Sequence, residues 1–204
     1  MPPDPEGHVL LSAQLVAEHV LVLVYLRHAC AAVVFVDALT GLLIGKTDFK
    51  GTAGDVVADG PIELPVPDQQ IIAHAQPPVL IPKHASIRTV TSRSDSCDFY
   101  MSVDTYISTP YILAGKISTG SHGHEVDVHG LGAGAGKNDD LVCRQVFYPS
   151  HDGTRIPMFI AHRANQDLSI PQPSLLYAYG GFATPVLPHF DPLFTAFMRN
   201  LGGV

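Results

Sequence analysis

The segment Tyr179-Gly180-Gly181-Phe182 contains the residues best suited to chemistry. It follows the mostly apolar segment 174–178, so we expect it at the end of a buried strand. Adjacent glycines allow the backbone to turn tightly and a ligand to approach closely. A tyrosine hydroxyl there could donate a hydrogen bond to the oxyanion that develops during acyl transfer. The alternative is a tyrosine that ends a strand, followed by a glycine turn that serves packing only.

Acyl transfer also needs a nucleophile, and the 204-residue sequence contains no G-x-S-x-G motif. In α/β-hydrolases that motif holds the nucleophilic serine on a sharp turn between a strand and a helix. The aspartate and the histidine of the triad follow this serine along the chain. We therefore assign none of the eleven histidines of this sequence to a catalytic triad.

A histidine cluster suggests a second chemistry, the binding of a transition metal. His122, His124 and His129 lie close to Glu125 and Asp127 in the sequence, and imidazole and carboxylate groups bind such metals. On a strand, however, His122 and His124 would share one face and His129 would lie on the other. We therefore predict no metal site and no cofactor.

The glycine-rich segment 130–138 is similar in composition to a phosphate-binding loop. A P-loop requires a glycine where Leu131 stands and a serine or threonine where Asn138 follows Lys137. The spacing of the dinucleotide-binding fingerprint fails as well. This segment is therefore predicted to be part of a flexible linker.

The residues before Gly120 predict an all-β structure. The first clear strand, at 19–27, is apolar on both faces, which predicts that both of its faces are covered. The region 47–85 is rich in proline and has little periodicity, so it is predicted to be a long loop, part of it an insertion. The further predicted strands are 31–36, 87–92, 98–103 and 111–116, a β-meander of the kind found in propeller blades.

The residues after 140 predict a change to alternating strands and helices. Strands at 143–148 and 156–160 flank Asp152-Gly153, a strong hairpin signal, and a third strand is expected at 174–179. Asp191-Pro192 should begin a helix, and Gly202 should end it. Leu193, Phe197 and Leu201 recur at helical spacing and predict an apolar stripe along that helix.

The composition indicates a soluble globular protein, with 46% hydrophobic and 15% charged residues. A formal net charge of −7 argues against nucleic acid as the main partner. The first residues lack the basic region of a secretory signal. Charged and histidine residues interrupt the apolar stretch 9–36, so no membrane span is expected. Three widely spaced cysteines suit a reducing compartment, and we predict a cytoplasmic protein.

Several stretches of the sequence together resemble the prolyl oligopeptidases, a family of serine peptidases. The segments 147–159 and 177–182 resemble the start of that family's catalytic domain, and 197–204 resembles its next helix and strand. Upstream, 22–26, 39–41, 98–100 and 110–113 resemble the last blades of the family's seven-bladed propeller.

The resemblance implies roles for two residues. Tyr179, directly before Gly-Gly-Phe, corresponds to the tyrosine that stabilises the oxyanion of the tetrahedral intermediate. Phe182 corresponds to the phenylalanine that lines the pocket for the substrate proline. The family cleaves short peptides on the carboxyl side of proline, its propeller limits access to small substrates, and a monomer is expected.

On this resemblance the expected fold class is β followed by α/β. Residues 1–120 would form a partial β-propeller with a Pro-rich insertion near 47–86, 121–140 a Gly/His-rich linker, and 141–204 the first strands and helix of an α/β-hydrolase domain. We expect an internal fragment of a peptidase that is inactive alone, because the Ser/Asp/His triad is missing. The alternative is a non-catalytic, propeller-derived module that binds peptides or regulates.

Overall fold

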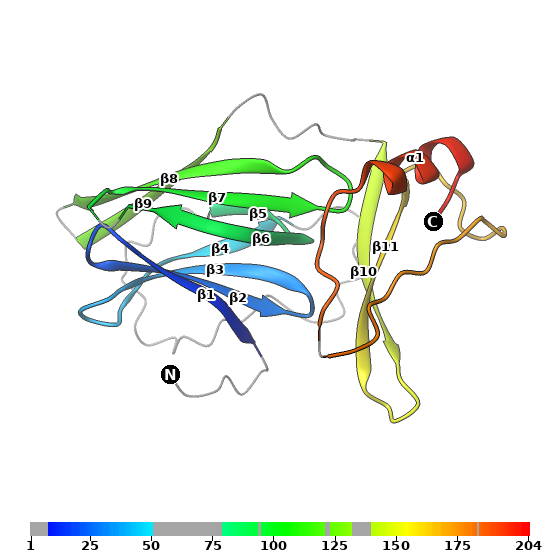
Figure 1. The fold of residues 1–204 in the computed structure, drawn as a ribbon, viewed down its shortest axis with the longest axis horizontal. Coiled ribbons are helices and arrows are strands. Elements are labelled where there is room, and N and C mark those ends of the chain that lie inside the picture. The colour runs from blue at the N-terminus through cyan, green and yellow to red at the C-terminus, as the bar shows by residue number, and fades with distance from the viewer. Residues whose placement is uncertain (1–7, 51–78, 94, 121–122, 132–139, 183) are drawn as a thin grey trace.

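The computed structural model describes residues 8–50, 79–93, 95–120, 123–131, 140–182 and 184–204. These residues form two β-sheets, a separate β-hairpin and one helix (Figure 1). The two sheets lie beside each other, and the hairpin stands across their ends. In the described part of the chain, no helix has the length and the apolar character that a membrane crossing requires.

The first sheet has five strands in the order β1-β2-β3-β4-β5. Neighbours among the first four are antiparallel, whereas β5 runs parallel to β4. The strands are β1 (Val9–Val16), β2 (Val20–Arg27), β3 (Cys30–Asp37), β4 (Leu43–Lys50) and β5 (Val79–Pro82). The loop predicted over 47–85 is therefore shorter than expected at both ends, and its middle lies outside the described residues.

The second sheet is a four-stranded antiparallel meander. Its strands are β6 (Ala85–Ser92), β7 (Asp98–Thr105), β8 (Tyr111–Gly120) and β9 (Gly123–Leu131). The linker predicted over 121–140 is thus wrong for 123–131. Val126, which is buried, and Val128 alternate with polar residues and pack against the core, a strand pattern that the surrounding glycines obscured.

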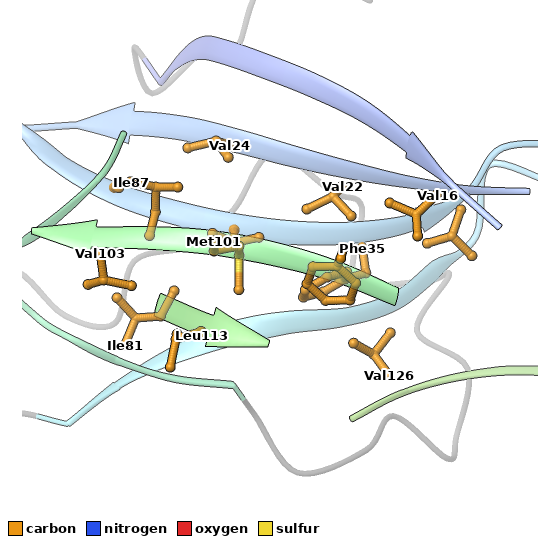
Figure 2. Packing of buried hydrophobic residues seen from close by; sticks show 14 of the residues in the cluster. Val16, Val22, Val24, Phe35, Ile81, Ile87, Met101, Val103, Leu113 and Val126 are labelled. Carbon is orange, nitrogen blue, oxygen red and sulfur yellow. The ribbon is translucent and has the colours of Figure 1, made fainter. Parts of the chain in front are cut away.

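The core lies between the two sheets (Figure 2). Val22 and Val24 of β2 face Met101 and Val103 of β7 across this layer, and the rings of Phe35 and Phe99 lie 5.6 Å apart. Successive side chains of a strand point to opposite faces. Leu23 and Tyr25 therefore form a smaller cluster on the other face of the first sheet, with Ala32, Val34 and Leu43. The prediction that this strand is covered on both faces is confirmed.

The hairpin and the helix follow their predicted turn and cap signals. Strands β10 (Leu141–Pro149) and β11 (Arg155–Arg163) flank a turn in which Gly153 has φ +86°. Helix α1 (Pro192–Leu201) begins after Asp191, whose carboxylate accepts the Leu193 N–H at 2.7 Å. It ends at Gly202, which has φ +61°.

One prediction for this region is wrong, since residues 174–179 are exposed and form no strand. Along the apolar stripe predicted for α1, Leu193 is 75% exposed and Leu201 is 65% exposed. The helix instead buries Thr195 and Met198.

The core packing makes Gly115 a sensitive position. A Cβ added there would lie 2.0 Å from the ring of Phe99, its cross-strand partner. We expect Gly115→Ala to lower the free energy of unfolding by about 1–3 kcal/mol, the usual cost of overpacking a core. Urea denaturation measures this change. Gly130→Ala is the control, since a Cβ there meets nothing within 4 Å, and equal effects of the two substitutions would contradict the packing described here.

Candidate functional site

The segment Tyr179–Phe182 forms an exposed turn that leads toward helix α1. Gly180 has φ +76°, a conformation that glycine adopts without steric cost. Phe182 also has a positive φ, +55°, which costs a residue with a Cβ roughly 1 kcal/mol or more. A Cβ at Gly181 would meet no described atom within 4 Å, so a ligand can approach the backbone there.

The two side chains predicted to act at this site are exposed. Tyr179 is 57% exposed and Phe182 is 95% exposed. Among the described residues, the Tyr179 hydroxyl has no hydrogen-bond partner, so its donor is available to a ligand. A backbone strained at Phe182 and a projecting aromatic side chain are features found at binding sites. The geometry can therefore present a hydroxyl donor and an aromatic surface on one short turn.

The chain on both sides of this turn is held by backbone pairing. Val204 donates its N–H to the Pro173 carbonyl, and Leu175 donates its N–H to the Val204 carbonyl, both at 2.9 Å. These two bonds form the pattern of a parallel bridge between positions 174 and 204. The segment before the turn and the segment after α1 thus lie side by side and parallel, as in a strand–helix–strand unit.

Helix α1 is anchored by an ion pair and by a close glycine contact. Arg199 donates two hydrogen bonds of 2.7 Å to the carboxylate of Asp140, directly before β10. The hydrogen bond from Arg199 lowers the pKa of Asp140 below its ordinary value. Gly203 lies against Phe197, so close that a Cβ there would be 2.0 Å from the ring.

A buried carboxylate connects the second sheet to the segment before α1. The Asp104 side chain is fully buried at the end of β7, and its Oδ2 accepts the Arg88 Nε–H at 2.7 Å. Its Oδ1 accepts the backbone N–H groups of Thr105 at 3.0 Å and Phe190 at 2.8 Å. Nearby, the Ser86 hydroxyl donates to the Pro188 carbonyl at 2.6 Å. These bonds fix the chain between the turn and the helix.

A row of aromatic rings runs along the same junction. The ring of Tyr177 lies 6.3 Å from Phe194, and His189 lies 6.2 Å from Phe194 and 6.0 Å from Tyr106. Tyr106 in turn lies 5.2 Å from Phe159 of β11. Burial raises the pKa of Tyr106, so this tyrosine is a neutral packing residue. The rings link the candidate turn to the hairpin and the sheets.

The structure does not bring the predicted histidine cluster together as a metal site. His122 lies outside the described residues, and so does most of the glycine-rich segment 130–138. His124 Nε2 lies 3.6 Å from the Asp37 carboxylate and its ring stacks on His19 at 6.1 Å. In the described part of the chain, no group of three potential ligands could hold a metal ion.

Sequence reasoning missed Asp104, Arg88 and His189 as members of the junction. Asp104 and Phe190 are far apart in the chain, and no local motif predicts that they meet. A carboxylate between a valine and a threonine in an apolar strand was the one available signal, because a buried charge requires partners.

Comparisons with known proteins agree with the resemblance predicted from the sequence. No family model matches the chain. A prolyl oligopeptidase of Omphalotus olearius is 27% identical over 192 residues, which are 92% of this chain and 20% of that protein. The prolyl endopeptidase of Elizabethkingia meningoseptica is 34% identical over 107 residues, which are 52% of this chain and 14% of that protein.

The solved structures agree at the level of the fold. Prolyl oligopeptidase B from Galerina marginata, bound to a 35mer hydrolysis and macrocyclization substrate, superposes with a TM-score of 0.68 at 21% identity, over 98% of this chain and 23% of that one. A prolyl endopeptidase structure gives 0.65 at 24% identity, over 100% of this chain and 24% of that one. The mostly β fold with one short helix therefore matches these structures, and the chain spans about a quarter of their length or less.

The buried carboxylate yields a stability prediction. We expect Asp104→Ala to lower the free energy of unfolding by about 2–4 kcal/mol, since two backbone N–H groups and Arg88 lose their acceptor. Urea denaturation measures the loss, and hydrogen exchange at the Phe190 amide should become faster. Asp95→Ala is the control, because its pair with Arg93 is exposed and worth about 1 kcal/mol or less. A loss no larger than that of the control would refute the anchoring role.

Proposed function

We propose that this chain, which is related to the prolyl oligopeptidases, comes from a serine peptidase that cleaves short peptides on the carboxyl side of proline. The observation that carries the proposal is the exposed Tyr-Gly-Gly-Phe turn in a chain similar to prolyl oligopeptidases and endopeptidases. Its relatives include enzymes solved with bound peptide substrates, which supports peptides as the ligands of this chain.

The architecture of the proposal has two parts. The meander β6–β9 and the first four strands β1–β4 are two consecutive four-stranded units, which supports their assignment as propeller blades. The hairpin, the turn and α1 would be the first elements of an α/β-hydrolase domain. The parallel bridge between 174 and 204 supports this assignment, because parallel strands joined by a helix are the repeating unit of such domains.

Tyr179 and Phe182 take different roles in this mechanism. The Tyr179 hydroxyl would donate to the oxyanion of the tetrahedral intermediate, and its free donor supports this role. Phe182 would pack against the substrate proline, for which its 95% exposed ring is available. The Ser/Asp/His triad is absent from these 204 residues, so we propose that this chain has no peptidase activity alone.

A second function is favoured by the missing G-x-S-x-G motif. The chain would then be a non-catalytic module that binds proline-containing peptides or regulates another protein. A monomer in the cytosol is proposed for either function. Binding of a Gly-Pro peptide without hydrolysis would favour the module over the peptidase.

The first experiment is hydrolysis of a fluorogenic Gly-Pro peptide by the purified 204-residue chain. We expect no turnover, because an oxyanion donor cannot replace a nucleophile. A serine-reactive fluorophosphonate probe, applied in parallel, should leave the chain unlabelled. Turnover with stoichiometric labelling would mean that a nucleophile is present and that the account of the triad is wrong.

The roles of Tyr179 and Phe182 can be tested in an active enzyme. Residues 141–204 of this chain would replace the corresponding segment of a prolyl endopeptidase relative. In that chimera we expect Tyr179→Phe to lower kcat roughly 100- to 1,000-fold, the usual effect of losing one oxyanion donor. Phe182→Ala should raise KM roughly tenfold or more, because an apolar contact with proline is lost.

The matched control is Tyr177→Phe, the same substitution two residues earlier. Tyr177 packs against Phe194 and has no proposed part in the reaction. It should leave kcat and KM nearly unchanged. Equal effects of Tyr177→Phe and Tyr179→Phe on kcat would remove the oxyanion role from Tyr179.

A further inference from the structure

Two β-bulges face each other across the edges of the two sheets. Strand β1 is the edge of the first sheet, and its register shifts between Leu10 and Ser12, so that Leu11 is the extra residue. Strand β6 is the edge of the second sheet, and its register shifts between Ile87 and Thr89, so that Arg88 is the extra residue. Bulges at sheet edges redirect side chains and are common beside active sites.

Both bulged residues line one open groove. The groove has a volume of about 560 Å³ and lies between β1, β6 and the segment that leads to α1. Leu11, which is 44% exposed, supplies part of an apolar wall, together with Leu187 and Pro188. Arg88 and His189 supply polar groups to the same groove. A concave surface that combines apolar walls with convergent polar groups is a usual form of a ligand site.

Arg88 is held in one orientation while part of its guanidinium stays free. Its Nε–H donates to the buried Asp104 carboxylate at 2.7 Å, yet its side chain is 58% exposed. The other oxygen of Asp104 is occupied by two backbone N–H groups, so the carboxylate is itself fixed. Among the described residues, the terminal nitrogens of Arg88 have no partner. The N–H groups of these two nitrogens are therefore hydrogen-bond donors that are oriented in advance beside the groove.

A second polar group lies at His189. Its Nδ1 lies 3.2 Å from the Leu187 carbonyl, which requires Nδ1 to carry the proton. Its ring is held between Tyr106 and Phe194, which fixes its position. The described residues give Nε2 no partner, so this nitrogen is available to a ligand in the groove that Arg88 also lines.

We propose that this groove binds the C-terminal carboxylate of a short peptide, with Arg88 as the residue that recognises it. A planar guanidinium fork matches a carboxylate with two parallel hydrogen bonds. The apolar wall of Leu11, Leu187 and Pro188 would contact the side chain of the last residue. An extended peptide can lie along the edge strands on either side of the groove. The proposal rests on the proposed function for its ligand class, a short peptide.

The test compares two forms of one labelled peptide. A fluorescein-labelled octapeptide that contains Gly-Pro and ends in leucine is prepared as the free acid and as the C-terminal amide. Fluorescence anisotropy measures the binding of each form to the full 204-residue chain. We expect the free acid to bind about tenfold more tightly than the amide, since hydrogen bonds to a charged group are among the stronger ones.

The variant Arg88→Lys tests whether Arg88 causes the tighter binding of the free acid. Lysine keeps a positive charge beside Asp104, so the fold should persist, but it lacks the planar fork. The preference for the free acid should fall to about threefold or less. Arg93→Lys is the matched control, because Arg93 is an exposed arginine paired with Asp95 outside the groove, and it should keep the full preference.

Each outcome decides the proposal. Equal binding of acid and amide by the unmodified chain overturns the carboxylate site but leaves the peptide-binding function standing. An unchanged preference in Arg88→Lys places the carboxylate elsewhere and overturns the role of Arg88. Absence of binding by both peptide forms overturns the site and the peptide ligand class together, while the chimera with Tyr179→Phe still reports on the peptidase mechanism separately.

Discussion

The fully buried carboxylate of Asp104 is the interaction on which the arrangement of this molecule depends. It lies in the second sheet, yet it accepts hydrogen bonds from Arg88 of the neighbouring strand and from the backbone of Phe190, which is 86 positions away in the chain. A buried charge is stable only when such partners surround it. The chain between the candidate turn and α1 must therefore remain beside β6 and β7. Together with the backbone pairing at Val204, this group holds the segment that follows the turn and lines the groove.

The sequence could predict much of the sheets because their signals are local. Continuous apolar runs located β2 and β3, short strand-forming segments located β6, β7 and β8, and the Asp152-Gly153 turn located the hairpin. The caps of α1 were equally clear, since Asp191 and Gly202 act on neighbouring backbone groups. Each of these features depends on residues within a few positions of one another. The resemblance implied roles for Tyr179 and Phe182, which stay predictions, because no local pattern distinguishes these two residues from packing residues.

The features that failed or were missed depend on distant partners. Residues 174–179 are mostly apolar, but a strand needs neighbours, and within the described residues only Val204 pairs with this segment. Strand β9 was obscured by glycines, although its pairing with β8 runs from Gly120 to Ile112. The bulges at Leu11 and Arg88 are invisible in the sequence, because a bulge is defined by the register of two strands. The residue types of a segment indicate whether it can form a strand, but pairing with a neighbouring strand decides whether it does.

The exposure of the Tyr-Gly-Gly-Phe turn limits what it can do chemically. A hydroxyl stabilises an oxyanion strongly only where water is excluded, because the interaction weakens as the local dielectric rises. Tyr179 is 57% exposed, and Leu176 of the same segment and Leu193 of α1 are 83% and 75% exposed. The candidate donor and these apolar side chains are thus in contact with water. Backbone pairing and the Asp104 junction fix the position of the turn, but they do not exclude water from it. The catalytic role proposed for Tyr179 therefore requires both a nucleophile and a surface that covers these apolar side chains, and the chimera supplies both at once.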